Sequence, residues 1–251
     1  MFEGKKVVVT GASRDFGVTL SWNFARHGAT VYVVCRNLAD AQATCALVER
    51  HVPHARLRPM QCDLTRPHEI RTMAAAVRTD TQAIDILINN GAMWLQADDF
   101  LAASDDDIAA TINSGAVGPV LMTKHLLPLL RASGRGDIVN MVSKCGESGY
   151  ESSPAHEAFY AMKHAHAGFA EILGKRLRHS GIRCITLFPP KFDNTSPFDP
   201  AWEAVPRGDH MQRLNARSLV ETINFALTQP RSAYISEIRF EDNRIPDMPK
   251  E

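Results

Sequence analysis

The sequence predicts a doubly wound α/β fold, with one parallel sheet of about seven strands and helices on both faces. Short runs of β-branched and aliphatic residues alternate along the chain with longer amphipathic stretches. Most of these runs are apolar throughout, as is typical of strands that are covered on both faces. A glycine-containing turn also follows the first run, where the first helix is expected to begin.

The elements follow one another in a regular β-α order, which implies right-handed crossovers between parallel strands. The expected strands are 5–10, 30–35, 55–62, 84–89, 137–143, 182–188 and 234–240. The expected helices are 16–27, 38–51, 67–82, 105–130, 156–180 and 216–228. Thr65 with Pro67, and Ser104 before three aspartates, are residues that favour helix starts.

The overall composition limits the classes of partner. The 251 residues carry 28 basic and 28 acidic side chains, so the formal charge is zero. This balance argues against nucleic acid or an anionic membrane as the main partner. The chain starts a strand without a charged and apolar leader, and no apolar run is long enough to cross a bilayer. We therefore expect a cytoplasmic protein with a small-molecule substrate.

Cysteine and histidine usage predicts neither disulfides nor a metal site. The five cysteines are odd in number and scattered, which favours buried free thiols in a reducing compartment. His164 and His166 are two residues apart on an expected helix and cannot face one metal ion.

The turn TGASRDFG (10–17) joins the first strand to the first helix. Gly11 permits a tight turn, and Gly17 permits close packing of the helix on the sheet. The helix start then presents backbone N–H groups and a positive dipole to a pyrophosphate. At this position the turn predicts a dinucleotide site.

The end of the second strand favours NADP(H) over NAD(H). Cys35 stands where an NAD-preferring fold usually carries an acid for the ribose hydroxyls, and Arg36 follows it. Arg14 lies in the glycine turn. Two guanidinium groups near that ribose suit a 2′-phosphate.

Four motifs together resemble those of the short-chain dehydrogenase/reductases (SDRs), over nearly the whole chain. TGASRDFG resembles the family's TGxxxGxG, CDL (62–64) its adenine-contacting pair, NNGA (89–92) its NNAG, and PPKFDN (189–194) its PGxVxT. The resemblance implies a single Rossmann-like domain over 1–251, mainly nucleotide-binding over 1–100 and mainly catalytic over 101–251. It implies cofactor contacts from Gly11, Ser13, Arg14, Phe16, Gly17, Arg36, Asp63, Leu64, Asn89, Gly91, Lys163, Pro189 and Phe192.

Three departures from these motifs have physical consequences. Asp15 replaces the middle glycine and brings a carboxylate toward the diphosphate, which costs affinity unless it points away or pairs with Arg14. Gly91 is shifted by one position. Pro190 replaces a glycine and removes a backbone donor.

The resemblance also implies the catalytic residues. Asn113 matches the asparagine that holds a helix kink and a relay water, Ser143 the serine that polarises a substrate oxygen, and Lys163 the lysine that binds the nicotinamide ribose. The family pattern is A-Y-x-A-S-K-x-A-x-x-G-F/L. A gapless match to AFYAMKHAHAGF (158–169) places Phe159 at the tyrosine position and Tyr160 in the variable slot.

The missing phenol leaves the proton donor open. Tyr160 could substitute if a π-bulge or a late helix start turned it inward, since it lies about 100° from position 159 on the helix. A pairing of Tyr160 with His164 is a related option. Other candidates lie in the preceding loop: Lys144, Cys145, Glu147, Tyr150, His156 and Glu157.

Three functions therefore remain open: an atypical NADP(H)-dependent oxidoreductase acting on a carbonyl or hydroxyl of a small metabolite, a non-redox enzyme of the same fold, and an inert subunit that supports an active homologue.

Residues 189–215 are expected to form a flexible loop over the substrate. Oligomerisation as a homodimer or tetramer, or with a paralogue, is expected through helices 105–130 and 156–180. The residues considered for an apolar pocket are Met93, Trp94, Phe192, Phe198 and Trp202.

Overall fold

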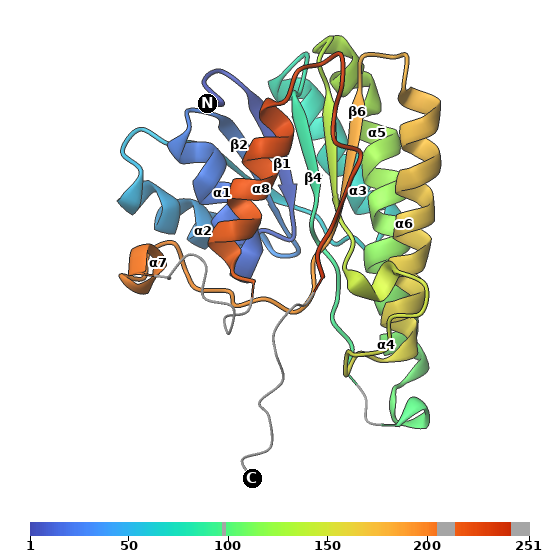
Figure 1. The fold of residues 1–251 in the computed structure, drawn as a ribbon. Coiled ribbons are helices and arrows are strands. Elements are labelled where there is room, and N and C mark those ends of the chain that lie inside the picture. The colour runs from blue at the N-terminus through green and yellow to red at the C-terminus, as the bar shows by residue number, and fades with distance from the viewer. Residues whose placement is uncertain (97–98, 205–213, 242–251) are drawn as a thin grey trace.

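The computed structural model describes residues 1–96, 99–204 and 214–241. Its centre is a seven-stranded parallel sheet in the order β3-β2-β1-β4-β5-β6-β7 (Figure 1). The strands are β1 Lys6–Thr10, β2 Thr30–Cys35, β3 Arg56–Gln61, β4 Ile86–Asn89, β5 Asp137–Met141, β6 Arg183–Phe188 and β7 Glu237–Arg239. The predicted fold class is confirmed, although β7 is shorter than the 234–240 that the sequence predicts.

The strand order reverses between β1 and β4. The chain runs outward from β1 to β3 and then returns to pair β4 with β1, where Val8 lies beside both Tyr32 and Leu87. In open α/β sheets such a switch point creates a crevice at the carboxyl ends of the strands.

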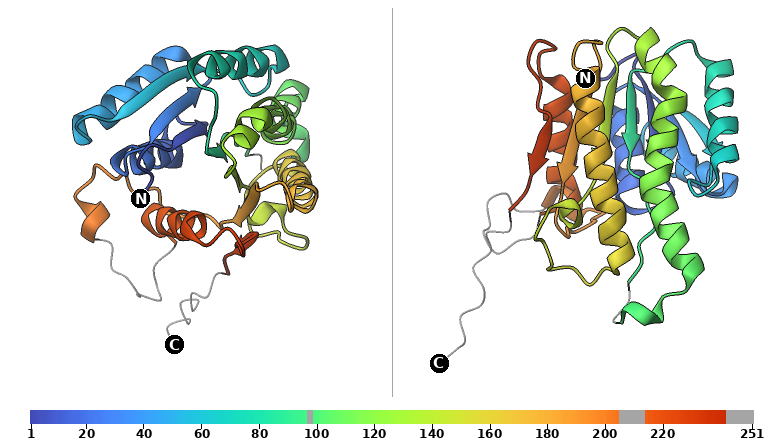
Figure 2. Two further views of the ribbon diagram at one scale, coloured as in Figure 1. Left: turned by 90° about the horizontal axis from the view of Figure 1, so that it is seen from above. Right: turned by 90° about the vertical axis from the view of Figure 1, so that its right-hand side faces the viewer.

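Helices cover both faces of the sheet (Figure 2). On one face lie α1 Asp15–Arg26, α2 Leu38–His51 and α8 Ala216–Thr228, and on the other α3 Pro67–Asp80, α5 Gly118–Ala132 and α6 Glu157–Leu177. Side chains of β1 alternate between the two cores: Val7 and Val9 join the first and Val8 the second. Burial on both faces explains why the strands are apolar throughout.

The predicted helix over 105–130 is divided. It consists of α4 Asp105–Ile112, a π-helical turn η2 Asn113–Val117, and α5. Ser104 caps α4 by accepting a hydrogen bond from the Asp107 N–H at 3.1 Å, as its sequence predicts. Within the π-turn, a Cβ on Gly115 would collide with the Met162 side chain of α6. This glycine allows η2 and α6 to approach closely.

The segment after β6 is only partly described, since 205–213 lie outside the described residues. It contains the short helix α7 Ala201–Ala204. Phe198 and Trp202 both pack on Trp22 of α1, with ring centroids 6.3 and 5.5 Å away. These two residues therefore belong to the core rather than to an apolar pocket. Two short 3-10 turns, η1 Phe100–Ala102 and η3 Lys144–Gly146, complete the elements of the described chain.

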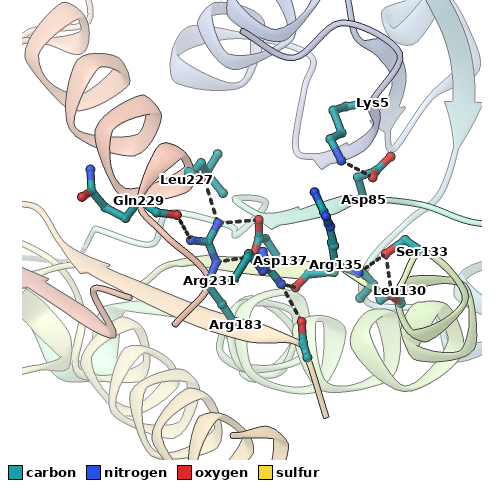
Figure 3. A network of polar contacts seen from close by, with 12 residues as sticks. Lys5, Asp85, Leu130, Ser133, Arg135, Asp137, Arg183, Leu227, Gln229 and Arg231 are labelled. Carbon is teal, nitrogen blue, oxygen red and sulfur yellow. Dashed lines mark hydrogen bonds and ion pairs between the residues drawn. The ribbon is translucent and has the colours of Figure 1, made fainter. Parts of the chain in front are cut away.

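The amino-terminal edge of the sheet carries a buried ion network (Figure 3). Asp137, the first residue of β5, accepts two bonds from Arg183 of β6, at 2.7 and 2.8 Å, and one from Arg231 at 2.6 Å. Arg183 also donates to the carbonyls of Leu227 and Gln229. The network ties the end of α8 and the segment after it to the central strands.

All five cysteines are buried and free. No described helix has the length and apolarity that a membrane span requires. The described residues contain no group of three His, Cys, Asp or Glu side chains placed to hold a metal ion.

Candidate active site

The glycine turn after β1 is built for close backbone approach. Gly11 has a φ of +64°, and a Cβ there would collide with the backbone of Gly91. A Cβ on Gly17 would collide with the Gly11 carbonyl. The two glycines therefore allow the β1–α1 turn, the helix start and the loop after β4 to lie against one another.

Asp15 occupies the middle position of this turn with a φ of 50°. Aspartate tolerates this left-handed conformation better than most residues, which explains how it can replace glycine here. Its carboxylate lies 3.8 Å from the Arg14 guanidinium, and both side chains are largely exposed. The pairing that the sequence raised as one solution is therefore present, in a loose and solvated form.

A cavity of about 520 Å³ opens beside the turn, at the carboxyl ends of β1 to β4. The predicted cofactor residues that line it are Gly11, Ser13, Arg14, Phe16, Arg36, Asp63, Leu64 and Gly91. Its size, the N-terminus of α1 and the glycines that keep its floor free of side chains all fit a dinucleotide.

Five predicted cofactor residues are not in this lining. Gly17 serves helix packing, and Phe192 packs edge-on against Phe16 at 5.3 Å. Pro189 uses its carbonyl to accept from the Lys144 N–H at 3.0 Å. The remaining two, Asn89 and Lys163, are buried side chains.

Asn90 lines the cavity in the place where Asn89 was expected. The Asn90 side chain donates to the carbonyls of Thr10 and Gly11, at 3.1 and 3.2 Å. The backbone N–H groups of Asn90 and Gly91 donate to the Thr10 hydroxyl at 3.0 Å. Asn90 thus fastens the end of β4 to the glycine turn. In the sequence, the only indication of this role was that NNGA contains two adjacent asparagines, either of which could face the cavity.

Asn89 lies in a buried polar chain beneath the site. Its side-chain amide donates to Asn140 of β5 at 3.0 Å and to Thr123 at 3.1 Å. His166 of α6 contacts the same Asn140 oxygen at 3.1 Å. Burial, followed by the charge of Lys163, lowers the pKa of His166 to about 3, so the ring is neutral. This series of hydrogen-bonded side chains connects α6 to β5.

The π-turn brings Ser114 rather than Asn113 to the loop after β4. Ser114 accepts a hydrogen bond from the Met93 N–H at 2.8 Å and donates to the Thr111 carbonyl at 2.9 Å. Ser114 also lines the cavity. Asn113 is half-buried at the first position of the turn. The sequence pattern does not indicate Ser114, because a regular helix would place Asn113 and Ser114 on different sides.

Ser143 follows β5 in a strained conformation. Its φ of 144° and ψ of 160° lie in a region that non-glycine residues rarely adopt. The Ser143 hydroxyl accepts from the Cys145 N–H at 3.2 Å and begins the turn η3. Because Ser143 follows β5, its hydroxyl lies at the carboxyl edge of the sheet, where ligands bind in such folds.

Lys163 is buried on α6 facing the end of β5. Its ammonium donates to the Met141 carbonyl at 2.9 Å. Burial lowers the pKa of Lys163 to about 8, and nearby Cys145 partly opposes the shift. A lysine near neutrality can exist in both protonation states at working pH.

Phe159 forms an apolar contact surface beside this lysine. The Lys163 nitrogen lies 5.4 Å from the centre of the Phe159 ring. The ring is 7% exposed and meets Trp94 edge-on, with centroids 4.8 Å apart. Trp94 is 49% exposed and also lines the nucleotide cavity, as does Met93. Phe159 and Trp94 thus connect that cavity to the surroundings of Lys163.

Tyr160 is engaged by the loop before α6. Its hydroxyl donates to the Ser153 carbonyl at 3.3 Å and accepts from the Ser153 N–H at 3.2 Å. Burial, followed by the neighbouring Cys145 thiol, raises the pKa of Tyr160. His164 contacts the Tyr160 backbone carbonyl at 3.0 Å, not the hydroxyl. The side-chain pair considered from the sequence is therefore not formed.

Most of the other candidate donors have structural partners. Lys144 is buried between Glu147 and Glu241, at 3.2 and 2.6 Å. His156 caps α6 by accepting from the Ala158 N–H at 3.0 Å, and its other nitrogen contacts the Phe100 carbonyl at 3.2 Å. Cys145 packs with Phe159 and Met162 in a small apolar cluster that Tyr150 borders. Glu157 is exposed at the first turn of α6.

A doubly wound parallel sheet with a glycine-turn cavity at its switch point defines a nucleotide-binding α/β protein. The chain belongs more specifically to the short chain dehydrogenase family, whose profile matches residues 5–204.

Individual relatives agree with this assignment. A 3beta-hydroxysteroid dehydrogenase of Mediterraneibacter gnavus is 27% identical over 192 residues, covering 76% of this chain and 67% of that protein. An NADP-dependent 3-hydroxy acid dehydrogenase of Schizosaccharomyces pombe is 23% identical, covering 94% and 91%. The structure of L-sorbose reductase from Gluconobacter frateurii, in complex with NADPH and L-sorbose, shares the fold with a TM-score of 0.80 at 19% identity, covering 98% of each chain.

Proposed function

We propose that the protein is an atypical NADP(H)-dependent oxidoreductase that acts on a carbonyl or hydroxyl of a small metabolite. One observation supports this most directly. Lys163 and Ser143 stand at the end of β5, and the ring beside the lysine belongs to Phe159. The nucleotide cavity opens next to them through Trp94.

Phe159 occupies the position of the family's tyrosine acid in this proposal. A phenyl ring carries no transferable proton, while general acid catalysis contributes about 10²- to 10⁴-fold. The π-turn that could have turned Tyr160 inward lies in η2 instead of α6, and the Tyr160 hydroxyl is bonded to Ser153. We therefore expect weak reduction of ordinary ketones.

The charged lining of the cavity favours NADP(H). Arg14 and Arg36 both line it, and both can contact a 2′-phosphate. Asp40 lies in the same lining, where Asn37 donates to its carboxylate at 3.1 Å. Two of the similar proteins described above carry NADP or NADPH in their names, which agrees with the preference.

Cofactor titration tests the first part of the proposal. The protein should bind NADPH more tightly than NADH. Arg36→Ala should weaken NADPH by about 10-fold, as loss of one charge-assisted contact predicts, and should leave NADH nearly unchanged. Equal loss for both nucleotides would place Arg36 away from the 2′-phosphate.

Phe159→Tyr tests the second part. A panel of aldehydes and ketones is offered with NADPH, and loss of reduced nicotinamide absorbance is followed. The variant should gain about 10²-fold or more in kcat/KM over the wild type. Substrate conversion without any change in nicotinamide absorbance would instead identify non-redox chemistry. Activity only beside a co-expressed paralogue would identify an inert supporting subunit.

We further propose that the chain forms one domain, with the nucleotide half in 1–100 and the catalytic half in 101–251. We also propose that copies of the chain associate through α4, α5 and α6. Val117, Val120 and Ile172 are exposed apolar residues of η2, α5 and α6 that suit such a contact. Light scattering of the wild type and of a Val120→Lys variant tests this.

A further inference from the structure

Lys144 lies in the turn after β5, directly after Ser143, and its side chain is buried. Its ammonium donates to the Phe240 carbonyl at 3.1 Å and to the Glu241 carboxylate at 2.6 Å, and the Glu147 carboxylate lies 3.2 Å away. Burial by itself would lower the pKa of Lys144, but the hydrogen bonds to Glu241 and Glu147 raise it above its ordinary value. The ammonium therefore keeps its proton at neutral pH, so Lys144 is a poor general acid.

The backbone of Lys144 is held as well. Its N–H donates at 3.0 Å to the carbonyl of Pro189, the residue after β6, and its carbonyl accepts from the Glu147 N–H at 2.9 Å. The same turn lies close against α6, because a Cβ on Gly146 would collide with the Lys163 carbonyl. The turn is thus held against β6 and α6 through its backbone, and against the residues after β7 through the Lys144 side chain.

Arg239, the last residue of β7, extends the same network. Its guanidinium donates to Glu147 at 2.9 Å and lies 4.2 Å from the ring centre of Phe188, the last residue of β6. An exposed ion pair contributes little to stability, whereas a buried ammonium without a partner is strongly unfavourable. Because Lys144 is buried, the turn and the end of β7 must stay together for its charge to be satisfied.

Ser143 needs such support. Its φ of 144° is one that non-glycine residues rarely adopt, and such conformations persist only where the surrounding structure holds them. We propose that Lys144 is a positioning residue, which holds the Ser143 hydroxyl in place for the substrate by tying the turn after β5 to the end of β7. The inference rests on the oxidoreductase proposed above, in which Ser143 contacts the substrate oxygen, and adds the residue on which that contact depends.

Steady-state kinetics with NADPH and the best carbonyl substrate of the panel test the proposal. Lys144→Met keeps the length of the side chain and removes its charge, and should lower kcat by about 10- to 100-fold, as displacement of a polarising hydroxyl predicts. The Kd for NADPH should change by less than about 3-fold, because the Pro189 contact comes from the backbone. Lys144→Arg keeps a cation and should recover most of the loss. As a control, Lys5→Met removes an ion pair with Asp85 at the amino-terminal edge, where the two atoms are 2.8 Å apart, and should leave kcat unchanged.

The Ser143→Ala background shows whether Lys144 acts through the serine. The hydroxyl is then gone, so Lys144→Met should lower kcat further by less than about 2-fold. A general loss of structure would instead give the same fold-change with and without the hydroxyl. The same cycle is measured in Phe159→Tyr, in which the remaining rates are expected to be higher.

A second readout requires no turnover. If Lys144 maintains the strain at Ser143, Ser143→Gly should raise the urea midpoint of the wild type, but not that of Lys144→Met, in which the turn can relax. Should Lys144→Met fail to fold, Glu241→Ala replaces it in both cycles. The Glu241 side chain is 79% exposed, so its removal should leave the fold intact and lower kcat by a smaller factor, about 2- to 5-fold.

The outcomes separate the inference from the function on which it rests. Equal losses of kcat with and without the Ser143 hydroxyl, or an equal rise of the urea midpoint with and without Lys144, would overturn the inference and leave the proposed oxidoreductase intact. No turnover of any carbonyl, in the wild type and in Phe159→Tyr, would overturn the proposed function and this role of Lys144 together.

Discussion

The two edges of the parallel sheet differ in how well their charged groups are paired and in whether their backbone is strained. At the amino-terminal edge, the charges of Asp137, Arg183 and Arg231 satisfy one another and nearby carbonyls (Figure 3). At the carboxyl edge, Ser143 has a strained backbone, and the buried Lys163 forms no ion pair with an acidic side chain in the described part of the chain.

This difference separates stability from function within one sheet. Strained residues and uncompensated charges persist only where the surrounding structure holds them in place. Here the saturated edge belongs to the same strands, β5 and β6, that present the strained edge. We infer that the amino-terminal network stabilises the fold and that the carboxyl edge costs stability. Four measurements test this contrast.

The largest effect is expected at Asp137. Asp137→Ala leaves the Arg183 guanidinium, which is 3% exposed, without its partner. Removing one partner of a buried ion pair costs about 3–5 kcal/mol, to be measured by urea unfolding. The double variant Asp137→Leu, Arg183→Met should recover part of the loss. Lys5→Ala, which removes a half-exposed partner of Asp85, is a control with an expected cost below about 1 kcal/mol.

Replacing Lys163 should raise the free energy of unfolding, whereas replacing Asp137 should lower it. The pKa of Lys163 is about 8 in the fold and 10.5 ordinarily, so between these pH values the unfolded chain binds the extra proton. Stability from this group therefore rises as pH increases from 8 to 10.5, and below pH 8 its burial costs about 3 kcal/mol. We expect Lys163→Met to be more stable than the wild type at pH 7, with a difference that vanishes by pH 10.5. A constant difference across this range would show that Lys163 is not destabilised by burial.

Features that depend on the local chain could be predicted from the sequence. The strands were predictable because their residues are buried on both faces, so the apolar runs mark them directly. Arg14, Arg36 and Ser143 were predictable because they are close in sequence to strand ends. In each case the local chain determines the position.

Residues that depend on contacts between distant elements were not predictable. The π-turn contains Gly115, which lies against Met162 of α6, and Ser114 of the same turn contacts Met93. Asn90 was not predictable because only the three-dimensional contact with Thr10 distinguishes it from Asn89. For Phe198 and Trp202 the sequence left a pocket lining and ordinary packing open, because nothing in their segment indicated their contact with Trp22.

Ser143 tests whether backbone strain is present at the carboxyl edge. Glycine can adopt a φ of 144° at little cost, whereas serine and alanine cannot. Ser143→Gly should stabilise the protein by about 1 kcal/mol, after allowance for the greater freedom of glycine in the unfolded chain. Ser143→Ala keeps the strain and is the matched control. Equal stabilities of the two variants, by urea unfolding, would contradict the strain.

The smallest effect is expected at Asp15, where the carboxyl edge meets the nucleotide cavity. The Asp15 carboxylate is 63% exposed and stands at the start of α1, where a pyrophosphate is expected to bind. Its repulsion of the phosphates is weakened by solvent and by Arg14, so removing it should tighten NADPH by only about 2- to 5-fold. Asp15→Asn removes the charge and keeps a residue that tolerates a φ of 50°, whereas Asp15→Gly removes the charge and the strain together. Fluorescence titration at low and high salt separates the two effects, since only the charge effect should shrink with salt. If both variants bind NADPH no better than the wild type at low salt, the carboxylate points away from the phosphates. Its charge would then be as favourably placed as the charges at the amino-terminal edge.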